Sequence, residues 1–174
     1  MRLTITSFLT EPKLATALQA LVGDAWAGAQ VALPGSRRKF DMAFRSGETM
    51  ILVEYDGDDH YRDSMKCKAD REKDVLAAAN GASLVRVPYW VQLDSVTLGH
   101  WFGLEADVVQ DFPHGFITTK LFPASFCELG VERFRRELNG LPTAIRDSVI
   151  ESLRARCVEH GTEYVVPTGL RDLL

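Results

Sequence analysis

Two runs of alternating apolar and polar residues, separated by a short turn, constrain the fold more than any other part of this sequence. The apolar members of these runs are Phe40, Met42 and Phe44 before the turn and Ile51, Val53 and Tyr55 after it. Side chains in a strand alternate between its two faces, so each apolar set shares one face. Ser46-Gly47 is typical of the turn between two such strands. The pattern therefore predicts an antiparallel hairpin, whose opposite face would carry Asp41, Ala43, Leu52, Glu54 and Asp56.

Helix and strand signals on either side of the hairpin complete the order α-β-β-β-α-β. Before it, Thr10-Glu11-Pro12 is typical of a helix start and Gly23 of its end, and a short strand is expected over residues 30–33. After it, a charged helix is expected over residues 64–80 and a strand over residues 84–87. The apolar stripe of the charged helix is expected at Met65, Ala69, Leu76 and Ala79. This order predicts an α/β fold in which helices flank a mixed sheet.

The last third of the chain is less regular and is expected to form a mostly helical extension. Residues 89–128 contain many aromatic and turn residues without a dominant period. The aromatic side chains there can either stack on bases or pack in a small core. Helices are expected over residues 131–138 and 142–161, and a strand over residues 164–166. Because no linker or repeat divides the sequence, residues 1–90 and the extension 91–174 are expected to form one domain.

The charge balance excludes a globally basic surface for nucleic acid. The chain has 174 residues, of which 24 are acidic and 20 basic, and the stretch from Asp94 to Phe116 holds four acids and no lysine or arginine. A contact with DNA would therefore need a local basic patch. No apolar run is long enough to span a membrane, the first residues lack the apolar stretch of a leader, and the three cysteines are widely spaced. We therefore expect a cytoplasmic protein with no membrane contact.

The predicted hairpin gathers acidic side chains on one face. If its turn is symmetric about Gly47-Glu48, Asp41 lies opposite Glu54, with Cβ atoms about 4.5–5.5 Å apart, and Asp56 follows two residues later. Such carboxylates repel one another unless a positive charge neutralises them, and Mg²⁺ prefers oxygen ligands of this kind. The alternative is that the three acids lie on the solvated face of a half-exposed sheet. Leu52 shares their face, which favours a recessed site.

His60 follows Asp56 by four residues, on the loop after Gly57. Beside clustered acids, a histidine is a candidate general base or proton shuttle, because its ordinary pKa lies near neutrality. The alternative is an ordinary histidine of a surface loop.

Four segments of the first half of the chain carry a family resemblance. They are RKFDMAF (residues 38–44), ILVEYDGDDH (51–60), DREKD (70–74) and LVRVPY (84–89). In this order they resemble the PD-(D/E)XK nuclease superfamily, and most closely its branch of very-short-patch-repair-like endonucleases. The resemblance implies a restriction-endonuclease-like core, α-β-β-β-α-β, over about half of the chain, residues 11–90, followed by the helical extension.

The resemblance also implies roles for individual residues. Asp41 resembles the first metal-binding acid of the family, Glu54 the second, and Glu11 the acid often found on the first helix of the core. Glu11 is equally well explained as an acid favoured in the first turn of a helix. Asp56 stands where many members have a catalytic lysine. Branches with Glu-x-Asp-Gly here use a downstream histidine, whose place His60 takes; alternatively, a lysine reaches in from the next helix, as Lys66, Lys68 or Lys73.

The implied activity is phosphodiester hydrolysis by a Mg²⁺-dependent DNA endonuclease or nickase, with Mn²⁺ as a substitute metal. The implied metal ligands are Asp41, Glu54 and Asp56. The basic residues expected to contact the DNA backbone are Arg37, Arg38, Lys39, Arg62, Lys66 and Lys73. Two alternatives stay open: a nuclease-like module that binds nucleic acid or protein without cleavage, and a hydrolase of small phosphate esters. A homodimer contact or a protein partner is expected at the C-terminal region.

Overall fold

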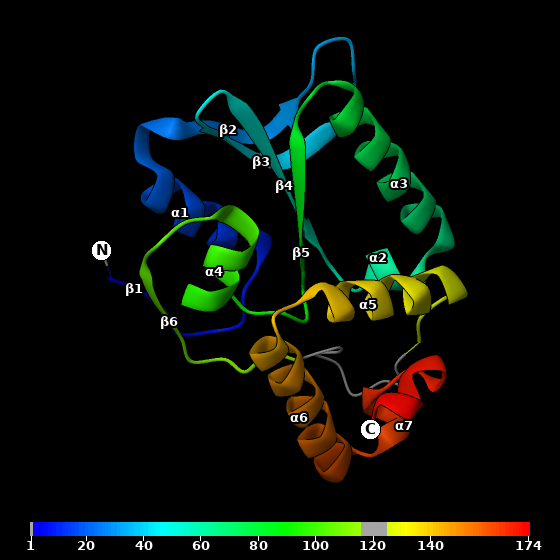
Figure 1. Ribbon diagram of the computed structural model, residues 1–174. Coiled ribbons are helices and arrows are strands. Elements are labelled where there is room, and N and C mark those ends of the chain that lie inside the picture. The colour runs from blue at the N-terminus through cyan, green and yellow to red at the C-terminus, as the bar shows by residue number, and fades with distance from the viewer. Residues whose placement is uncertain (1, 116–124) are drawn as a thin grey trace.

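A four-stranded mixed sheet lies at the centre of this computed structural model, which describes residues 2–115 and 125–174 (Figure 1). In order across the sheet, its strands are β2 (Trp26–Ala32), β3 (Lys39–Ser46), β4 (Thr49–Asp56) and β5 (Ser83–Pro88). The pairs β2–β3 and β3–β4 are antiparallel, whereas β4–β5 is parallel. The predicted α/β class with a mixed sheet is therefore confirmed.

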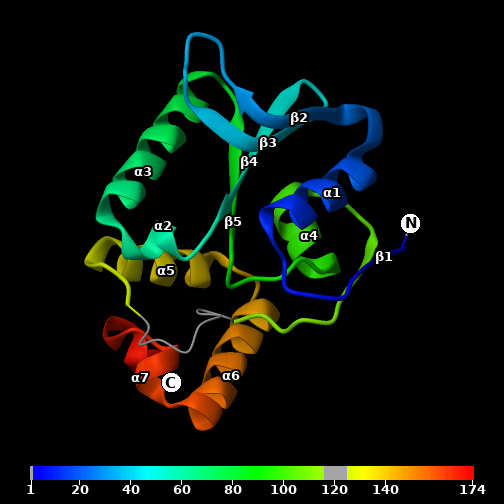
Figure 2. The same cartoon turned by 180° about the vertical axis from the view of Figure 1, so that it is seen from behind.

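Helices cover both faces of this sheet. The helices of the described residues are α1 (Glu11–Val22), α2 (Asp59–Arg62), α3 (Ser64–Ala79), α4 (Ser95–Phe102), α5 (Glu128–Gly140), α6 (Thr143–His160) and α7 (Thr162–Val165), with short 3₁₀ turns η1 (Gly23–Ala25) and η2 (Thr168–Leu173). Leu14 and Leu18 of α1 pack on Met42 from one side, and Ala77 of α3 packs on Leu52 from the other. Figure 2 shows α5, α6 and α7 gathered beyond the end of the sheet at which β4 and β5 finish.

The hairpin has the symmetric register that the sequence predicted. Ser46 pairs with Thr49 and Met42 with Val53, so Asp41 and Glu54 are the next opposed residues. One assignment of a face was wrong: Phe40 belongs to the core beneath α3 and does not join Met42. The regular ladder between the two strands ends at Met42, and beyond it the side chain of Asp41, not the backbone of β3, accepts the hydrogen bond of Tyr55. The strict alternation of faces ends with it.

The buried face of α3 also differs from the prediction. Met65 is 69% exposed, and the buried residues are Cys67, Asp70 and Ala77. Asp63 caps the helix by accepting a hydrogen bond from the backbone N–H of Met65 at 2.8 Å. The helix turns an acidic side chain inward because arginines from distant parts of the chain reach it, and the apolar pattern of the helix alone could not show this.

The segment that lacked a dominant period forms a small second unit beside α1. β1 (Arg2–Ile5) pairs in parallel with β6 (Asp107–Gln110), and α4 precedes β6. A capping box at Asp94 starts α4. The two strands lie about one hundred residues apart in the sequence. Neither has a neighbouring strand in the sequence from which its pairing could be predicted.

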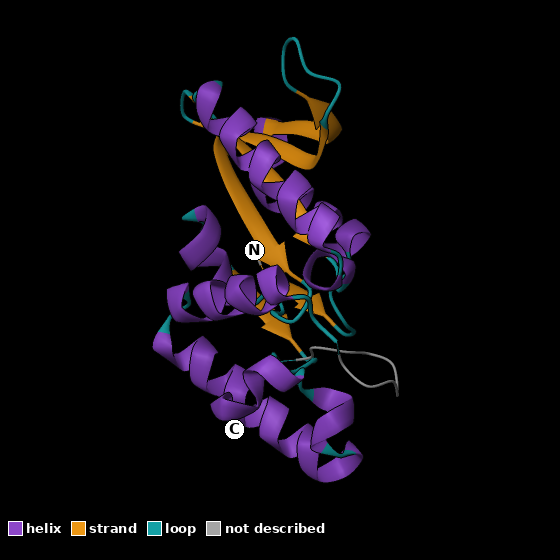
Figure 3. Cartoon of the chain, turned by 90° about the vertical axis from the view of Figure 1, so that its right-hand side faces the viewer, coloured by secondary structure: helices purple, strands orange, loops and turns teal. Residues whose placement is uncertain are grey.

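The described part of the C-terminal extension is mostly helical, with β6 as its one strand, and its helices fill much of the lower half of Figure 3. The strand predicted over residues 164–166 is wrong: this stretch lies in and just after the short helix α7. The apolar pair Val165 and Val166, which suggested a strand, is instead buried in the core that the extension forms. Trp90 is buried in the same core, with its ring 4.4 Å from that of Phe134. The aromatic stretch after β5 therefore packs in a core and does not offer a surface for bases.

None of the helices within residues 2–115 and 125–174 combines the length and the apolar character needed to cross a bilayer. The three cysteines are free thiols. Cys67 on α3 and Cys127 before α5 nevertheless lie side by side, with 3.8 Å between their sulfur atoms.

Candidate metal and catalytic centre

Three acidic side chains from three different elements come together at one level of the sheet, and we call Glu11, Asp41 and Glu54 the carboxylate cluster. Glu11 is the first residue of α1, Asp41 lies near the start of β3, and Glu54 lies near the end of β4. The backbone N–H of Tyr55 donates to Oδ2 of Asp41 at 2.8 Å, which fixes that carboxylate against β4. The structure thus brings together three of the acids predicted from the sequence.

The pKa values of the cluster show how closely its members interact. Glu54 is only 2% exposed, and this burial, helped by the negative charge of Asp41, raises its pKa to about 7, although Lys73 opposes the shift. The pKa of Glu11 is also raised, by burial and then by the charge of Asp41. Asp41 disfavours the charged form of both glutamates. A positive charge placed near the three acids would therefore stabilise their ionised forms.

Lys73 on α3 provides one such charge. Its Nζ donates to both carboxylate oxygens of Glu54, at 2.8 and 2.7 Å, and lies 5.5 Å from the centre of the Phe40 ring. The other lysines of α3 do not reach the cluster: Lys66 pairs with Asp59, and Lys68 is exposed. Of the three lysines that the sequence left open, Lys73 is therefore the one beside the acids.

Asp56 does not join the carboxylate cluster, although it was predicted as a third metal ligand. Its side chain is fully buried and both of its oxygens accept from Nη1 of Arg86, at 3.0 and 3.1 Å. Nη2 of Arg133, on α5, also donates to it. Both oxygens of Asp56 are thus already bonded to arginines, which leaves neither free for the cluster. We therefore assign Asp56 to a separate group, the ion-pair network, which consists of Asp56, His60, Asp70, Arg86 and Arg133.

His60 belongs to the ion-pair network and not to the cluster. Its Nδ1 lies 2.7 Å from Oδ2 of Asp70 and 3.1 Å from Oδ1 of Asp56. Burial lowers the pKa of His60, but the hydrogen bond to Asp70 and the charges of both aspartates outweigh burial and raise it. The ring is therefore a partner of structural carboxylates, and we do not place it beside Asp41 as a base.

The raised pKa of His60 predicts a pH-dependent contribution to stability. An unfolded histidine titrates near pH 6.5, whereas folded His60 keeps its proton to higher pH. Its contribution is thus fully present below the unfolded pKa and is lost as pH rises through the folded pKa. We expect the difference in unfolding free energy between wild type and His60→Asn to shrink between about pH 5.5 and 8.5. Urea titrations across this range measure it, with exposed His100→Asn as the control; a constant or growing difference would contradict the assignment.

Within the described residues, Asp56, His60 and Asp70 are also the only three side chains whose potential metal-binding atoms all lie within 4.8 Å of one another. Their negative charge is already balanced, because Arg133 donates to Asp70 at 2.7 Å and Arg86 pairs with Asp56. A cation would have to displace two guanidinium groups to enter. The carboxylate cluster is looser, but within the described residues Lys73 is the only charged side chain that forms an ion pair with it, and Mg²⁺ commonly needs just one or two protein carboxylates.

Most of the basic residues predicted to contact DNA form ion pairs in the structure. Arg38 pairs with Glu72, Arg62 with Asp58, Lys66 with Asp59 and Lys73 with Glu54. Arg37 and Lys39, which flank Arg38 just before Asp41, are exposed. Much of the positive charge predicted for DNA contact is therefore shared with acids, and Lys73 is the part of it that contacts the cluster.

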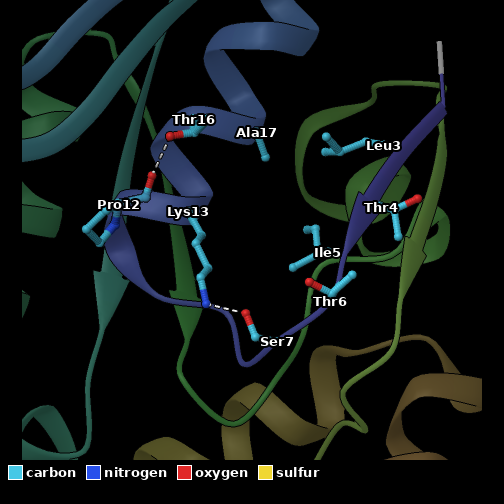
Figure 4. Close-up of a pocket in the computed structure, with 9 residues that line it drawn as sticks. All are labelled: Leu3, Thr4, Ile5, Thr6, Ser7, Pro12, Lys13, Thr16 and Ala17. Atoms are coloured by element: carbon cyan, nitrogen blue, oxygen red, sulfur yellow. Dashed lines mark hydrogen bonds between the residues drawn. The ribbon is translucent and has the colours of Figure 1, made fainter.

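An open pocket of about 330 Å³ lies between β1 and the start of α1, and none of the three acids of the cluster lines it (Figure 4). Lys13 is its only ionisable lining residue, and its ammonium group already donates to Ser7 and to the carbonyl of Phe8. The pocket is lined by no carboxylate, and its one ionisable group is already hydrogen-bonded, so the carboxylate cluster is the better candidate site.

Family models, curated proteins and solved structures that were compared with this chain gave no match.

Proposed function

We propose that this protein is a Mg²⁺-dependent DNA endonuclease or nickase built on a restriction-endonuclease-like core. One observation carries the proposal: a nearly fully buried glutamate, Glu54, lies beside two further acids, with Lys73 as the only basic side chain in contact among the described residues. The order α1-β2-β3-β4-α3-β5 agrees with that core. The four sequence segments that resemble the family surround the same side chains.

The donor set of the cluster suits a hard divalent cation. Carboxylate oxygens are the ligands that Mg²⁺ and Mn²⁺ prefer, and Asp41 and Glu54 would hold the ion, with Glu11 close by. When bound, Mg²⁺ polarises a phosphoryl oxygen and lowers the pKa of a bound water. In this assignment Asp56 and His60 are not ligands, because the ion-pair network uses them.

Lys73 supplies the positive side chain that the strand lacks at Asp56. Its ammonium group would orient the attacking water and stabilise the negative charge that develops on the phosphate. It comes from α3 instead of β4, yet it reaches the carboxylate of Glu54. The departure from the family pattern at Asp56 is therefore compatible with turnover.

DNA is the proposed substrate because basic residues border the cluster. Arg37 and Lys39 are exposed and precede Asp41 in the sequence. Arg38 pairs with Glu72 at the surface and can exchange this partner for a phosphate of the DNA backbone. Such exchange costs little, since exposed ion pairs contribute about 0–1 kcal/mol.

A second candidate function is a nuclease-like module that binds nucleic acid without cutting it. The observation in its favour is that Lys73 donates to both oxygens of Glu54, which satisfies this carboxylate in the absence of a cation. In such a module, the lysine would have replaced the metal instead of assisting it.

The direct test is the nicking of supercoiled plasmid with Mg²⁺ or Mn²⁺. We expect Asp41→Ala to lose roughly a hundredfold or more in rate, because a catalytic metal supplies several kcal/mol of charge stabilisation. Asp24→Ala, which removes an exposed acid outside the cluster, should cut like wild type. Tight DNA binding by wild type with no cleavage under either ion would instead favour the non-cleaving module.

A further inference from the structure

Gln30 has an unusual backbone conformation for a residue with a side chain. Its φ is 52°, and among the described residues it is the only one other than glycine with a positive φ. The eight other positive-φ positions there are all glycines, so this chain ordinarily uses glycine where the left-handed region is required. Glutamine at this position, therefore, is not explained by the turn of the backbone alone. Strained residues of this kind concentrate at functional sites.

The position of Gln30 in the sheet places it level with the carboxylate cluster. Ala29 pairs with Met42 and Val31 with Phe40, so Gln30 lies across from Asp41 on the neighbouring strand. Asp41 in turn lies across from Glu54, by the register of β3 with β4. Gln30, Asp41 and Glu54 thus form one row across three adjacent strands.

The side chain of Gln30 contacts the third acid. Its amide Nε2 donates to Oε1 of Glu11 at 3.4 Å, and this bond lowers the pKa of Glu11 against the effects of burial and of Asp41. Glu11 forms no ion pair within residues 2–115 and 125–174. Gln30 is therefore a neutral donor to Glu11, which, like Asp41, has no charged partner among the described residues.

We propose that Gln30 is a positioning residue for divalent-cation binding by the carboxylate cluster. In this proposal, the left-handed backbone turns the amide toward α1, and the amide, by donating to Oε1 of Glu11, holds that carboxylate with its other oxygen available to a cation. This inference rests on the proposed function, because it assigns Gln30 to the same cluster. It adds a residue from β2 for which the sequence pattern gave no signal.

The test compares Gln30→Gly with Gln30→Asn and wild type. Glycine removes both the amide and the backbone strain, whereas asparagine tolerates the left-handed conformation but is one methylene too short to keep the contact. We expect Gln30→Gly to melt at the same or a higher temperature than wild type without metal. Both variants should bind Mg²⁺ about tenfold more weakly, as measured by the shift of melting temperature with Mg²⁺ concentration. Nicking should fall most at low Mg²⁺ and recover partly at high Mg²⁺.

Ala29→Gly is the matched control, since it changes an exposed neighbour on the same strand that has no polar side-chain atom. It should melt slightly lower, as glycine weakens a strand, with Mg²⁺ affinity unchanged. If wild type nicks DNA and Gln30→Gly binds Mg²⁺ and nicks equally well, the role of Gln30 is overturned and the proposed function stands. If wild type neither binds Mg²⁺ nor nicks, the proposed function is overturned, together with the role in cation binding.

Discussion

Lys73→Ala is expected to lower the rate of DNA nicking by roughly a hundred- to a thousandfold, the loss typical when one preorganised donor to developing negative charge is removed. Lys73 donates to Glu54 from α3 and is the only basic side chain that contacts the cluster in the described part of the chain. The fold should survive, because Glu54 can then take up a proton: burial already brings its pKa to about 7, and Lys73 is among the groups that hold it down. Plasmid nicking under single-turnover conditions measures the loss.

Lys68→Ala is the control for this variant, since Lys68 is an exposed lysine of the same helix. It should retain the wild-type rate and melting temperature. A Lys73→Ala protein that cuts as fast as wild type would remove Lys73 from the mechanism. One that binds Mg²⁺ more tightly, while wild type does not cut at all, would show that the lysine substitutes for a cation and would favour the non-cleaving module.

Arg133→Ala is expected to destabilise the fold by about 3–5 kcal/mol, the usual cost of removing one partner from a buried ion pair. The side chain of Arg133 is only 6% exposed. It donates to Asp70 and to Glu137, each at 2.7 Å, and also contacts Asp56. The variant leaves these acids buried with fewer partners, and urea unfolding monitored by circular dichroism reports the change in free energy.

Arg135→Ala provides a matched comparison on the same helix. Arg135 pairs with Asp172 at the surface, where its side chain is 37% exposed, so its loss should cost no more than about 1 kcal/mol. Equal effects of the two substitutions would mean that the buried network contributes no more than a surface pair, contrary to the role assigned to it here.

The parts of the fold that depend on local pattern were predictable. The hairpin register followed from two alternating runs and a short turn, and it correctly placed Met42 opposite Val53, next to Asp41 and Glu54. The parallel addition of β5 followed from the helix that separates it from β4. These features need no knowledge of distant residues, because side-chain period and turn length determine them.

The composition of the site depended on residues far apart in the chain, and there the sequence was a poorer guide. Asp56 shares a face with Glu54, but a strand pattern gives only the face, and Arg133 reaches Asp56 from a helix 77 residues later. One signal was present: Arg86 interrupts the apolar strand 84–87, and a charge inside such a strand needs a buried acidic partner. Gln30 gave no such signal, because its role depends on a backbone angle.

Arg133 also determines how the polypeptide can be divided. It lies on α5, yet its partners Asp56 and Asp70 lie on β4 and α3, so the helical C-terminal half supplies a positive charge that balances buried acids of the N-terminal half. A truncated protein that stopped at residue 90 would retain these aspartates in the interior without that guanidinium. The two halves should therefore melt in a single cooperative transition, and neither is a detachable module that could be exchanged between proteins on its own.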